Sequence, residues 1–141
     1  EVTIGHSLGA MANIIAMEKL QIHPKQMISI APLIDLGKNF EASMDALDTP
    51  KVIQHTFFER FEERFKKPVS HYNLFDWSIF STELSKHWVA YDANDIVSPY
   101  SFMKAFLGSN SAIDSTDYPD AGHERIIKSP MLIEDLLRVL V

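Results

Sequence analysis

The first twenty residues, EVTIGHSLGAMANIIAMEKL (residues 1–20), decide the fold. Val2–Ile4 is a short β-branched run that ends at Gly5, which is typical of a buried strand. Apolar residues then recur at spacings of three and four as far as Leu20, and this spacing predicts a helix that His23-Pro24 ends. Ser7 therefore lies in a tight turn that leads from a strand into a helix.

The turn has the pattern Gly-x-Ser-x-Gly, formed by Gly5, Ser7 and Gly9. In this setting the serine takes a strained backbone conformation that exposes its hydroxyl, and the glycines let the chain pass close to itself. The N–H of Leu8 would lie at the positive end of the helix dipole, where it can stabilise an oxyanion. The pattern favours a nucleophilic serine, and the alternative is an inert tight turn.

Strands and helices alternate along the rest of the chain. Beyond the first strand and helix, the expected elements are a strand within 27–34, a mixed excursion at 37–49, a helix capped by Thr49-Pro50 and ended by Pro68, a strand at 88–91, a helix capped by Ser98-Pro99, a short strand at 111–115 and a last helix opened by Ser129-Pro130. This alternation predicts an α/β fold with a mostly parallel sheet and flanking helices.

A serine hydroxyl needs a base, which is usually a histidine oriented by a carboxylate. His123 follows Gly122 in the loop after the fourth strand, where it can reach the carboxyl end of the sheet. His6 is expected to be a packed or partly exposed ring with a structural role. The other histidines suit the task of the base less well, because of their places in the sequence: His23, His55, His71 and His87.

Three aspartates compete to orient the imidazole of His123. Asp95 follows the third strand and precedes a helix, which makes it the first choice. Asp92 lies three residues closer to that strand, and Asp35 follows the second strand. The preferred set of Ser7, Asp95 and His123 runs in the chain order Ser, Asp, His.

Three segments, GHSLGA, YDANDIVSP and DAGHERIIKSP, together resemble the nucleophile elbow, acid loop and histidine loop of the α/β-hydrolase superfamily, in their usual order. The resemblance implies a serine esterase or lipase-like site with Ser7 as nucleophile, His123 as base and Asp95 as acid. In that family the acid precedes a proline by four residues, as Asp95 precedes Pro99. One departure is Ser98, which separates Val97 from the proline.

The resemblance covers residues 1–141 and implies a partial α/β-hydrolase domain, the C-terminal portion that starts at the nucleophile-elbow strand. Several strands and a further oxyanion loop precede that strand in the family, and none is found here. The portion alone would lack a second oxyanion donor, a loss that costs about 100- to 1000-fold in rate. The first strand would also form an open edge, through which the chain could oligomerise.

The leading function is hydrolysis of a carboxylic ester or related acyl substrate through an acyl-enzyme on Ser7. A second hypothesis keeps the same three residues for acyl transfer or thioester hydrolysis, because one fold hosts several chemistries. A third is a non-catalytic ligand-binding or scaffold protein that retains the turn as architecture.

Aromatic residues recur at helical spacing at Phe57, Phe58, Phe61 and Phe65, and Phe75 and Trp77 follow them. The simpler interpretation places the four phenylalanines in a helix core. In the alternative, some of them form a cap within residues 37–85 over an apolar substrate pocket.

Composition excludes several other classes of protein. The net charge of −6 argues against nucleic-acid binding, and no apolar stretch approaches the roughly 20 residues of a membrane span. The absence of cysteine excludes disulfides and thiolate metal sites and fits a reducing compartment, so a cytoplasmic location is expected. No phosphate-binding glycine loop or metal-ligand spacing is present, so neither an organic cofactor nor a metal is expected.

Overall fold

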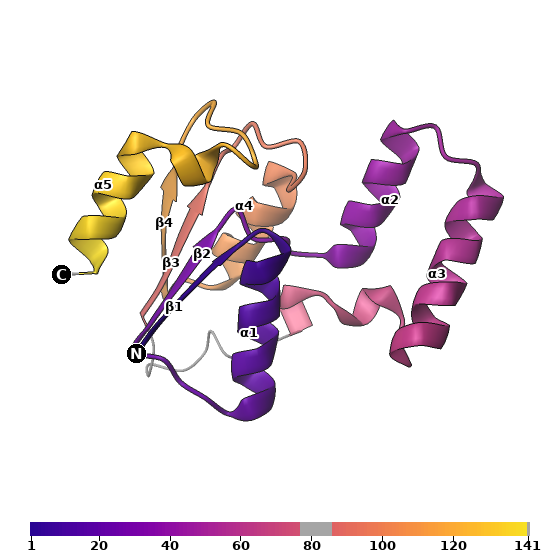
Figure 1. Cartoon of the computed structure of the whole chain (residues 1–141), viewed down its shortest axis with the longest axis horizontal. Helices are drawn as coiled ribbons and strands as arrows, with labels where there is room; N and C mark the ends of the chain where they lie inside the picture. The colour runs from indigo at the N-terminus through magenta and orange to yellow at the C-terminus, as the bar shows by residue number, and fades with distance from the viewer. Residues whose placement is uncertain (77–85, 141) are drawn as a thin grey trace.

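The computed structural model describes residues 1–76 and 86–140. Its centre is a four-stranded sheet in which every pair of neighbouring strands is parallel and the strand order follows the sequence (Figure 1). The strands are β1 (Val2–His6), β2 (Gln26–Ile30), β3 (Lys86–Tyr91) and β4 (Ile113–Asp117). The predicted parallel α/β architecture is confirmed.

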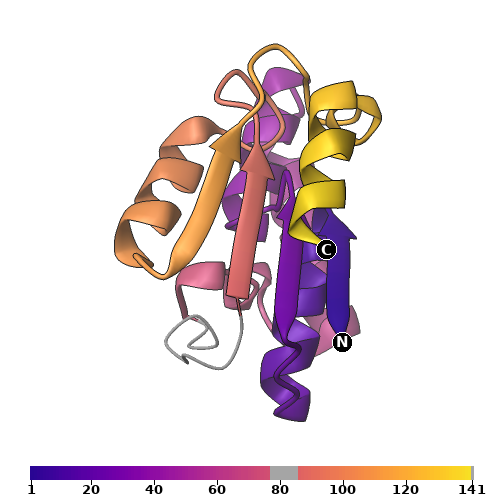
Figure 2. The same ribbon diagram turned by 90° about the vertical axis from the view of Figure 1, so that its left-hand side faces the viewer.

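Helices cover both faces of this sheet. The helices are α1 (Leu8–Leu20), α2 (Leu36–Ala46), α3 (Lys51–Phe65), α4 (Tyr100–Ser109) and α5 (Pro130–Val139), with short 3₁₀ turns η1 (Val69–His71), η2 (Leu74–Asp76) and η4 (Ile126–Lys128). Helices α1 and α4 lie on one face of the sheet and α5 on the other, whereas α2 and α3 form a pair to one side (Figures 1 and 2).

Alternation along the strands gives the sheet two apolar faces. Met27 and Val89 belong to the core that includes Met11 of α1 and Phe106 of α4. Their strand neighbours belong to the opposite core, which includes Ile28, Trp88 and the fully buried Leu132 of α5. Because successive side chains of a strand point to opposite faces, near-continuous apolar strands are what a sheet covered on both sides requires.

The register aligns the carboxyl ends of the strands. His6 pairs with Ile30, Ile30 pairs with Ala90, and Tyr91 pairs with Asp117. The loops that follow the four strands therefore meet along one edge of the sheet, where ligands of parallel α/β sheets bind.

Two of the predicted helix caps are wrong. Helix α3 begins at Lys51 with Pro50 at its N-cap, so Thr49 does not cap it through its side chain. Pro99 occupies the N-cap of α4, and the hydroxyl of Ser98 instead donates to the carbonyl oxygen of Pro32 at 2.8 Å. The third cap is confirmed, because the side chain of Ser129 accepts from the N–H of Leu132.

The fourth strand is displaced from its predicted position at 111–115 and runs from Ile113 to Asp117. Its side chains are mostly exposed or half-buried, because β4 lies at the edge of the sheet. A polar edge strand lacks the apolar run that located the inner strands in the sequence.

The helix-core interpretation of the aromatic stripe is wrong for two of its members. Phe57 is 37% exposed and Phe65 is 53% exposed, whereas Phe58 and Phe61 are half-buried. Gln54 is the buried residue of α3. The ring of Phe57 packs edge-on against Phe40 of α2 at a centroid distance of 5.1 Å, so the stripe joins α2 to α3.

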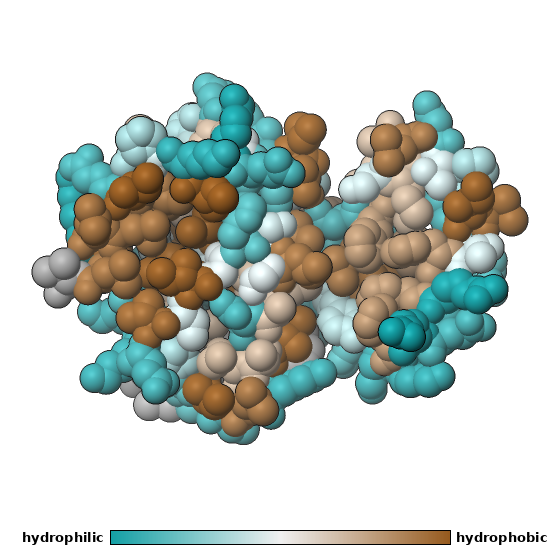
Figure 3. Space-filling model, in the orientation of Figure 1, coloured by the Kyte–Doolittle hydropathy of each residue, from teal (hydrophilic) through white to brown (hydrophobic). Residues whose placement is uncertain are grey.

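Strand β1 forms an edge of the described sheet and pairs with β2 alone. Val2 and Ile4 on this strand are exposed, as is Leu137 of α5, and apolar side chains gather on this part of the surface (Figure 3). Pairing of this edge with another chain stays a prediction. No helix within residues 1–76 and 86–140 is both long and apolar enough to cross a membrane, and the cytoplasmic location also stays a prediction.

Candidate active site

Ser7 is the single residue between β1 and α1, and its backbone conformation is strained. Its φ of 55° and ψ of −126° differ from both strand and helix values, and a positive φ is unusual for a residue with a Cβ. The conformation is held by the N–H of Ser7, which donates to the carbonyl oxygen of Ile30 at 2.9 Å. Ser7 thus has the strained backbone conformation that was expected from the sequence pattern.

The two glycines of the pattern, Gly5 and Gly9, differ in the space available for a Cβ atom. A Cβ at Gly5 would lie 2.6 Å from the Cα of Ala10 and 2.8 Å from its nitrogen, so β1 and α1 can cross this closely only at a glycine. A Cβ at Gly9 would meet no described atom within 4 Å. The close approach of the chain to itself therefore depends on Gly5.

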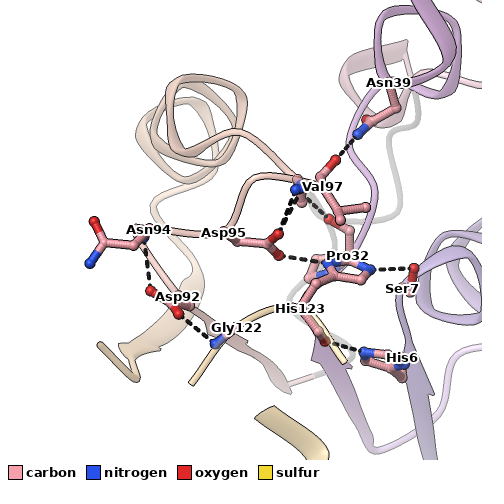
Figure 4. Close-up of polar contacts among 11 residues, drawn as sticks. His6, Ser7, Pro32, Asn39, Asp92, Asn94, Asp95, Val97, Gly122 and His123 are labelled. Carbon is pink, nitrogen blue, oxygen red and sulfur yellow. Dashed lines mark hydrogen bonds and ion pairs between the residues drawn. The ribbon is translucent and has the colours of Figure 1, made fainter. Parts of the chain in front are cut away.

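The hydroxyl of Ser7 meets the imidazole of His123. The Nε2 atom of His123 lies 2.7 Å from the Oγ of Ser7, although the residues are separated by 116 positions (Figure 4). Only 9% of the His123 side chain is exposed. A serine hydroxyl and a shielded imidazole within hydrogen-bond distance form the arrangement needed for proton transfer from oxygen to nitrogen.

Asp95 orients this imidazole from the other side. Its Oδ2 lies 2.6 Å from the Nδ1 of His123, and its Oδ1 accepts hydrogen bonds from the backbone N–H groups of Val97 and Ser98. A carboxylate can only accept, so Nδ1 carries the hydrogen, and the neutral ring keeps Nε2 free to accept from Ser7.

The pKa of Asp95 follows from the same contacts. Burial raises the pKa of this carboxyl, but the hydrogen bond from His123 and those from Ser98 and Val97 outweigh burial and hold the pKa below its ordinary value. The ionised carboxylate therefore stabilises the fold above the ordinary carboxyl pKa, and this stabilisation is lost as the pH falls through the lowered pKa.

The two competing aspartates have other partners. Asp35 caps α2, where its Oδ1 accepts from the N–H of Lys38 at 3.0 Å. Asp92 is buried and accepts from the N–H of Gly122 at 2.7 Å and from that of Asn94 at 2.8 Å. Of the three candidates, Asp95 is the one whose carboxylate is hydrogen-bonded to His123.

Two of the other histidines, His6 and His87, are hydrogen-bonded within the fold. The Nε2 of His6 lies 2.8 Å from the carbonyl oxygen of His123, a contact that the sequence did not predict. His87 is buried in β3 and is hydrogen-bonded to the hydroxyl of Ser29 at 2.9 Å. Burial lowers the pKa of His87 to about 4, so it stays neutral near pH 7.

Leu8 is the first residue of α1, directly after the serine. The first N–H groups of a helix have no partner within that helix, and the helix dipole makes this end positive. The backbone N–H of Leu8 can therefore donate a hydrogen bond to an oxygen that becomes negatively charged beside Ser7.

An apolar groove of about 460 Å³ starts at Leu8 and follows α1 as far as Lys19. Its walls are Tyr72 and residues of α1, α2 and α3, among them Ala12, Ala16, Phe40, Phe61 and Phe65. Apolar side chains gather between α1 and the α2–α3 pair (Figure 3). Phe61 and Phe65 thus contribute to a cap-like wall, while Phe75 is not among the lining residues and Trp77 lies outside the described residues.

Within residues 1–76 and 86–140, no group of three or more histidine, aspartate or glutamate side chains could hold a metal ion.

Comparison with known proteins places this geometry in context. An esterase of Pyrococcus furiosus superposes with a TM-score of 0.62 at 18% identity, over 98% of this chain and 50% of the esterase. A structure from work on carboxylesterases of the thaumarchaeon Nitrososphaera gargenis gives a TM-score of 0.58 at 14% identity, over 99% of this chain and 63% of the other. The mouse α/β hydrolase domain-containing protein 10 gives a TM-score of 0.55 at 16% identity, over 99% of this chain and 62% of the mouse protein.

No protein-family profile matches the sequence, and no curated protein matches it. The structural likenesses show that the chain has the α/β-hydrolase fold. The chain spans 50% to 63% of the length of these three proteins, in agreement with the prediction that it corresponds to part of that fold.

Proposed function

We propose that this chain carries the nucleophile, base and acid of a serine hydrolase that cleaves carboxylic esters. The observation that carries the proposal is the continuous chain of contacts from the Oγ of Ser7 through the imidazole of His123 to Asp95, with distances of 2.7 Å and 2.6 Å. The esterases among proteins of the same fold add support.

In the acylation step, the Oγ of Ser7 attacks the acyl carbon while its proton passes to the Nε2 of His123. The carbonyl electron pair moves onto oxygen, and the N–H of Leu8 stabilises the oxyanion. When the carbonyl re-forms, the bond to the leaving alkoxide breaks, and the alkoxide takes the proton from Nε2.

In the deacylation step, water attacks the acyl-enzyme and gives its proton to the same Nε2. Collapse of the second oxyanion returns that proton to the Oγ of Ser7 and releases the carboxylic acid. Asp95 keeps the hydrogen on Nδ1 throughout and stabilises the imidazolium that forms in each step.

A fluorophosphonate probe tests the nucleophile directly. We expect the full-length protein to gain one phosphonyl group on Ser7, identified by peptide mass spectrometry, because the phosphorus mimics the attacked acyl carbon. The Ser7→Ala variant should gain none. A full-length wild-type protein that remains unmodified would remove the case for catalysis and favour a scaffold.

We further propose that the apolar groove receives the acyl chain of the substrate. Its lining includes Leu8, the residue that directly follows Ser7, and its walls are mainly aliphatic and aromatic. Burial of methylene groups in such a groove stabilises the bound ester, so esters with several acyl carbons should be better substrates than acetates.

The Ala12→Leu variant tests the groove, because Ala12 lines it and the added atoms would narrow it. We expect kcat/KM for a p-nitrophenyl hexanoate to fall about tenfold relative to that for the acetate, since one methylene in an apolar pocket is worth about 10- to 200-fold. Ala42→Leu is the matched control, because Ala42 is exposed on α2 and does not line the groove. Equal losses for acetate and hexanoate would place the acyl chain elsewhere.

A further inference from the structure

His6 links the serine turn to the histidine loop. It is the last residue of β1 and directly precedes Ser7. Its Nε2 lies 2.8 Å from the carbonyl oxygen of His123, and the two rings are 5.3 Å apart (Figure 4). A carbonyl oxygen can only accept, so the Nε2 of His6 carries a hydrogen and donates it.

Asp92 holds the same loop one residue earlier. Its Oδ2 accepts from the N–H of Gly122 at 2.7 Å, while its Oδ1 accepts from the N–H of Asn94 in its own loop (Figure 4). Both oxygens are thereby fixed, and the residue is only 3% exposed. A buried carboxylate bonded on both oxygens is a rigid anchor for Gly122, the residue that precedes His123.

The loop itself needs such anchors. Gly122 adopts a φ of +72°, a conformation that glycine takes without strain. Because glycine has no Cβ, its backbone can also adopt other conformations, and contacts from outside the loop must select this one. Within the loop, the carbonyl oxygen of Gly122 accepts a hydrogen bond from the N–H of Ile126 at 3.0 Å. The carbonyl of His123 and the N–H of Gly122 are thus held by side chains from two other strand ends, His6 at the end of β1 and Asp92 directly after β3.

We propose that His6 and Asp92 are positioning residues that fix the backbone around His123 and so keep its imidazole between Ser7 and Asp95. The inference rests on the proposed hydrolase function. Neither side chain exchanges a proton with substrate; both act through His123. A displacement of about 1 Å at a catalytic group can cost about 100-fold in rate, so the hydrogen bonds to the carbonyl of His123 and to the N–H of the adjoining Gly122 have a large effect on turnover.

The His6→Phe variant tests this, because it keeps an aromatic ring and removes the donor. We expect kcat for p-nitrophenyl butyrate to fall about 10- to 100-fold with KM changed less than about threefold, since the acyl groove is untouched. His6→Gln places an amide donor at a similar reach and should recover most of this loss. Equal losses in both variants would overturn the hydrogen-bonding role.

Asp92→Ala provides the second test and should behave like His6→Phe, because it frees the N–H of Gly122. Asn94→Ala is the matched control. It removes the hydrogen bond from the Asn94 side chain to Asp120, which joins the same two loops but touches neither Gly122 nor His123. This control should keep kcat within about twofold, and a loss as large as that of Asp92→Ala would mean that general loop stability explains the effect.

A spectroscopic readout separates this inference from the proposed function. The hydrogen between the Nδ1 of His123 and Asp95 should give a far-downfield proton resonance in the wild type that is broadened or lost in His6→Phe and retained in His6→Gln. Failure of the wild type to react with the fluorophosphonate defeats the hydrolase proposal, whatever this resonance shows. A reactive wild type with unchanged kcat and resonance in both His6→Phe and Asp92→Ala overturns the positioning pair.

Discussion

His123→Ala is expected to lower kcat for ester hydrolysis by about six orders of magnitude, and Ser7→Ala by about as much. Without the imidazole, no described group within hydrogen-bond distance can take the proton from the Oγ of Ser7. The double variant should lose no more than either single variant, because residues that act as one unit are strongly non-additive. The measurement is kcat with p-nitrophenyl butyrate, with each variant checked for folding by thermal unfolding.

His55→Ala is the matched control for this loss. His55 lies on the exposed face of α3, where its Nε2 is 3.3 Å from a carboxylate oxygen of Glu59. Replacing it removes an exposed contact that is worth little, so kcat should stay within about twofold of the wild type. If His123→Ala kept more than about one hundredth of the wild-type kcat, another base would have to act on Ser7.

The meeting of Ser7 with His123 could be predicted from sequence because it follows from topology. Apolar runs located β1, β2 and β3, and parallel pairing brings the loops after all four strands, β4 included, to one edge. Residues 7, 95 and 123 all follow strand ends, so their proximity required only the strand order and not the details of any side chain. Their catalytic roles stay predictions.

The sequence carried much less information about the contacts that refine the site. The proline that follows Ser98 predicted that Ser98 caps a helix. Instead, the N–H of Ser98 donates to Asp95, and the hydroxyl of Ser98 donates to the carbonyl oxygen of Pro32. His6 was assigned a structural role, and its bond to a carbonyl 117 positions away leaves no local pattern. Hydrogen bonds to distant backbone groups depend on the finished loop shape, which periodicity does not encode.

The prediction that the phenylalanines of α3 lie in a helix core was wrong for the two exposed ones, Phe57 and Phe65, for a related reason. Helical spacing in α3 predicts that one side of the helix is apolar, and it does not specify what that side faces. Phe61 and Phe65 face a groove shared with α1, and Phe57 packs on Phe40 of α2. The same pattern would arise in a helix that packs into a core and in one that forms the wall of a binding groove.

Asp95→Asn should lower kcat by about four orders of magnitude while leaving the fold in place. The N–H groups of Val97 and Ser98 both point at Oδ1, so an asparagine at this position must present its own oxygen to them. Its NH₂ group then faces the Nδ1 of His123. A donor at that place forces the hydrogen onto Nε2, and the ring can no longer accept the proton of Ser7.

Asp35→Asn is the control for this prediction, because Asp35 also follows a strand and accepts a backbone N–H but is not bonded to His123. Its kcat should stay near that of the wild type. Nitrogen-15 NMR of the imidazole supplies an independent test, since Asp95→Asn should move the hydrogen from Nδ1 to Nε2. A variant that kept hydrogen on Nδ1, or more than about one tenth of the wild-type kcat, would show that Asp95 does not set the state of the ring.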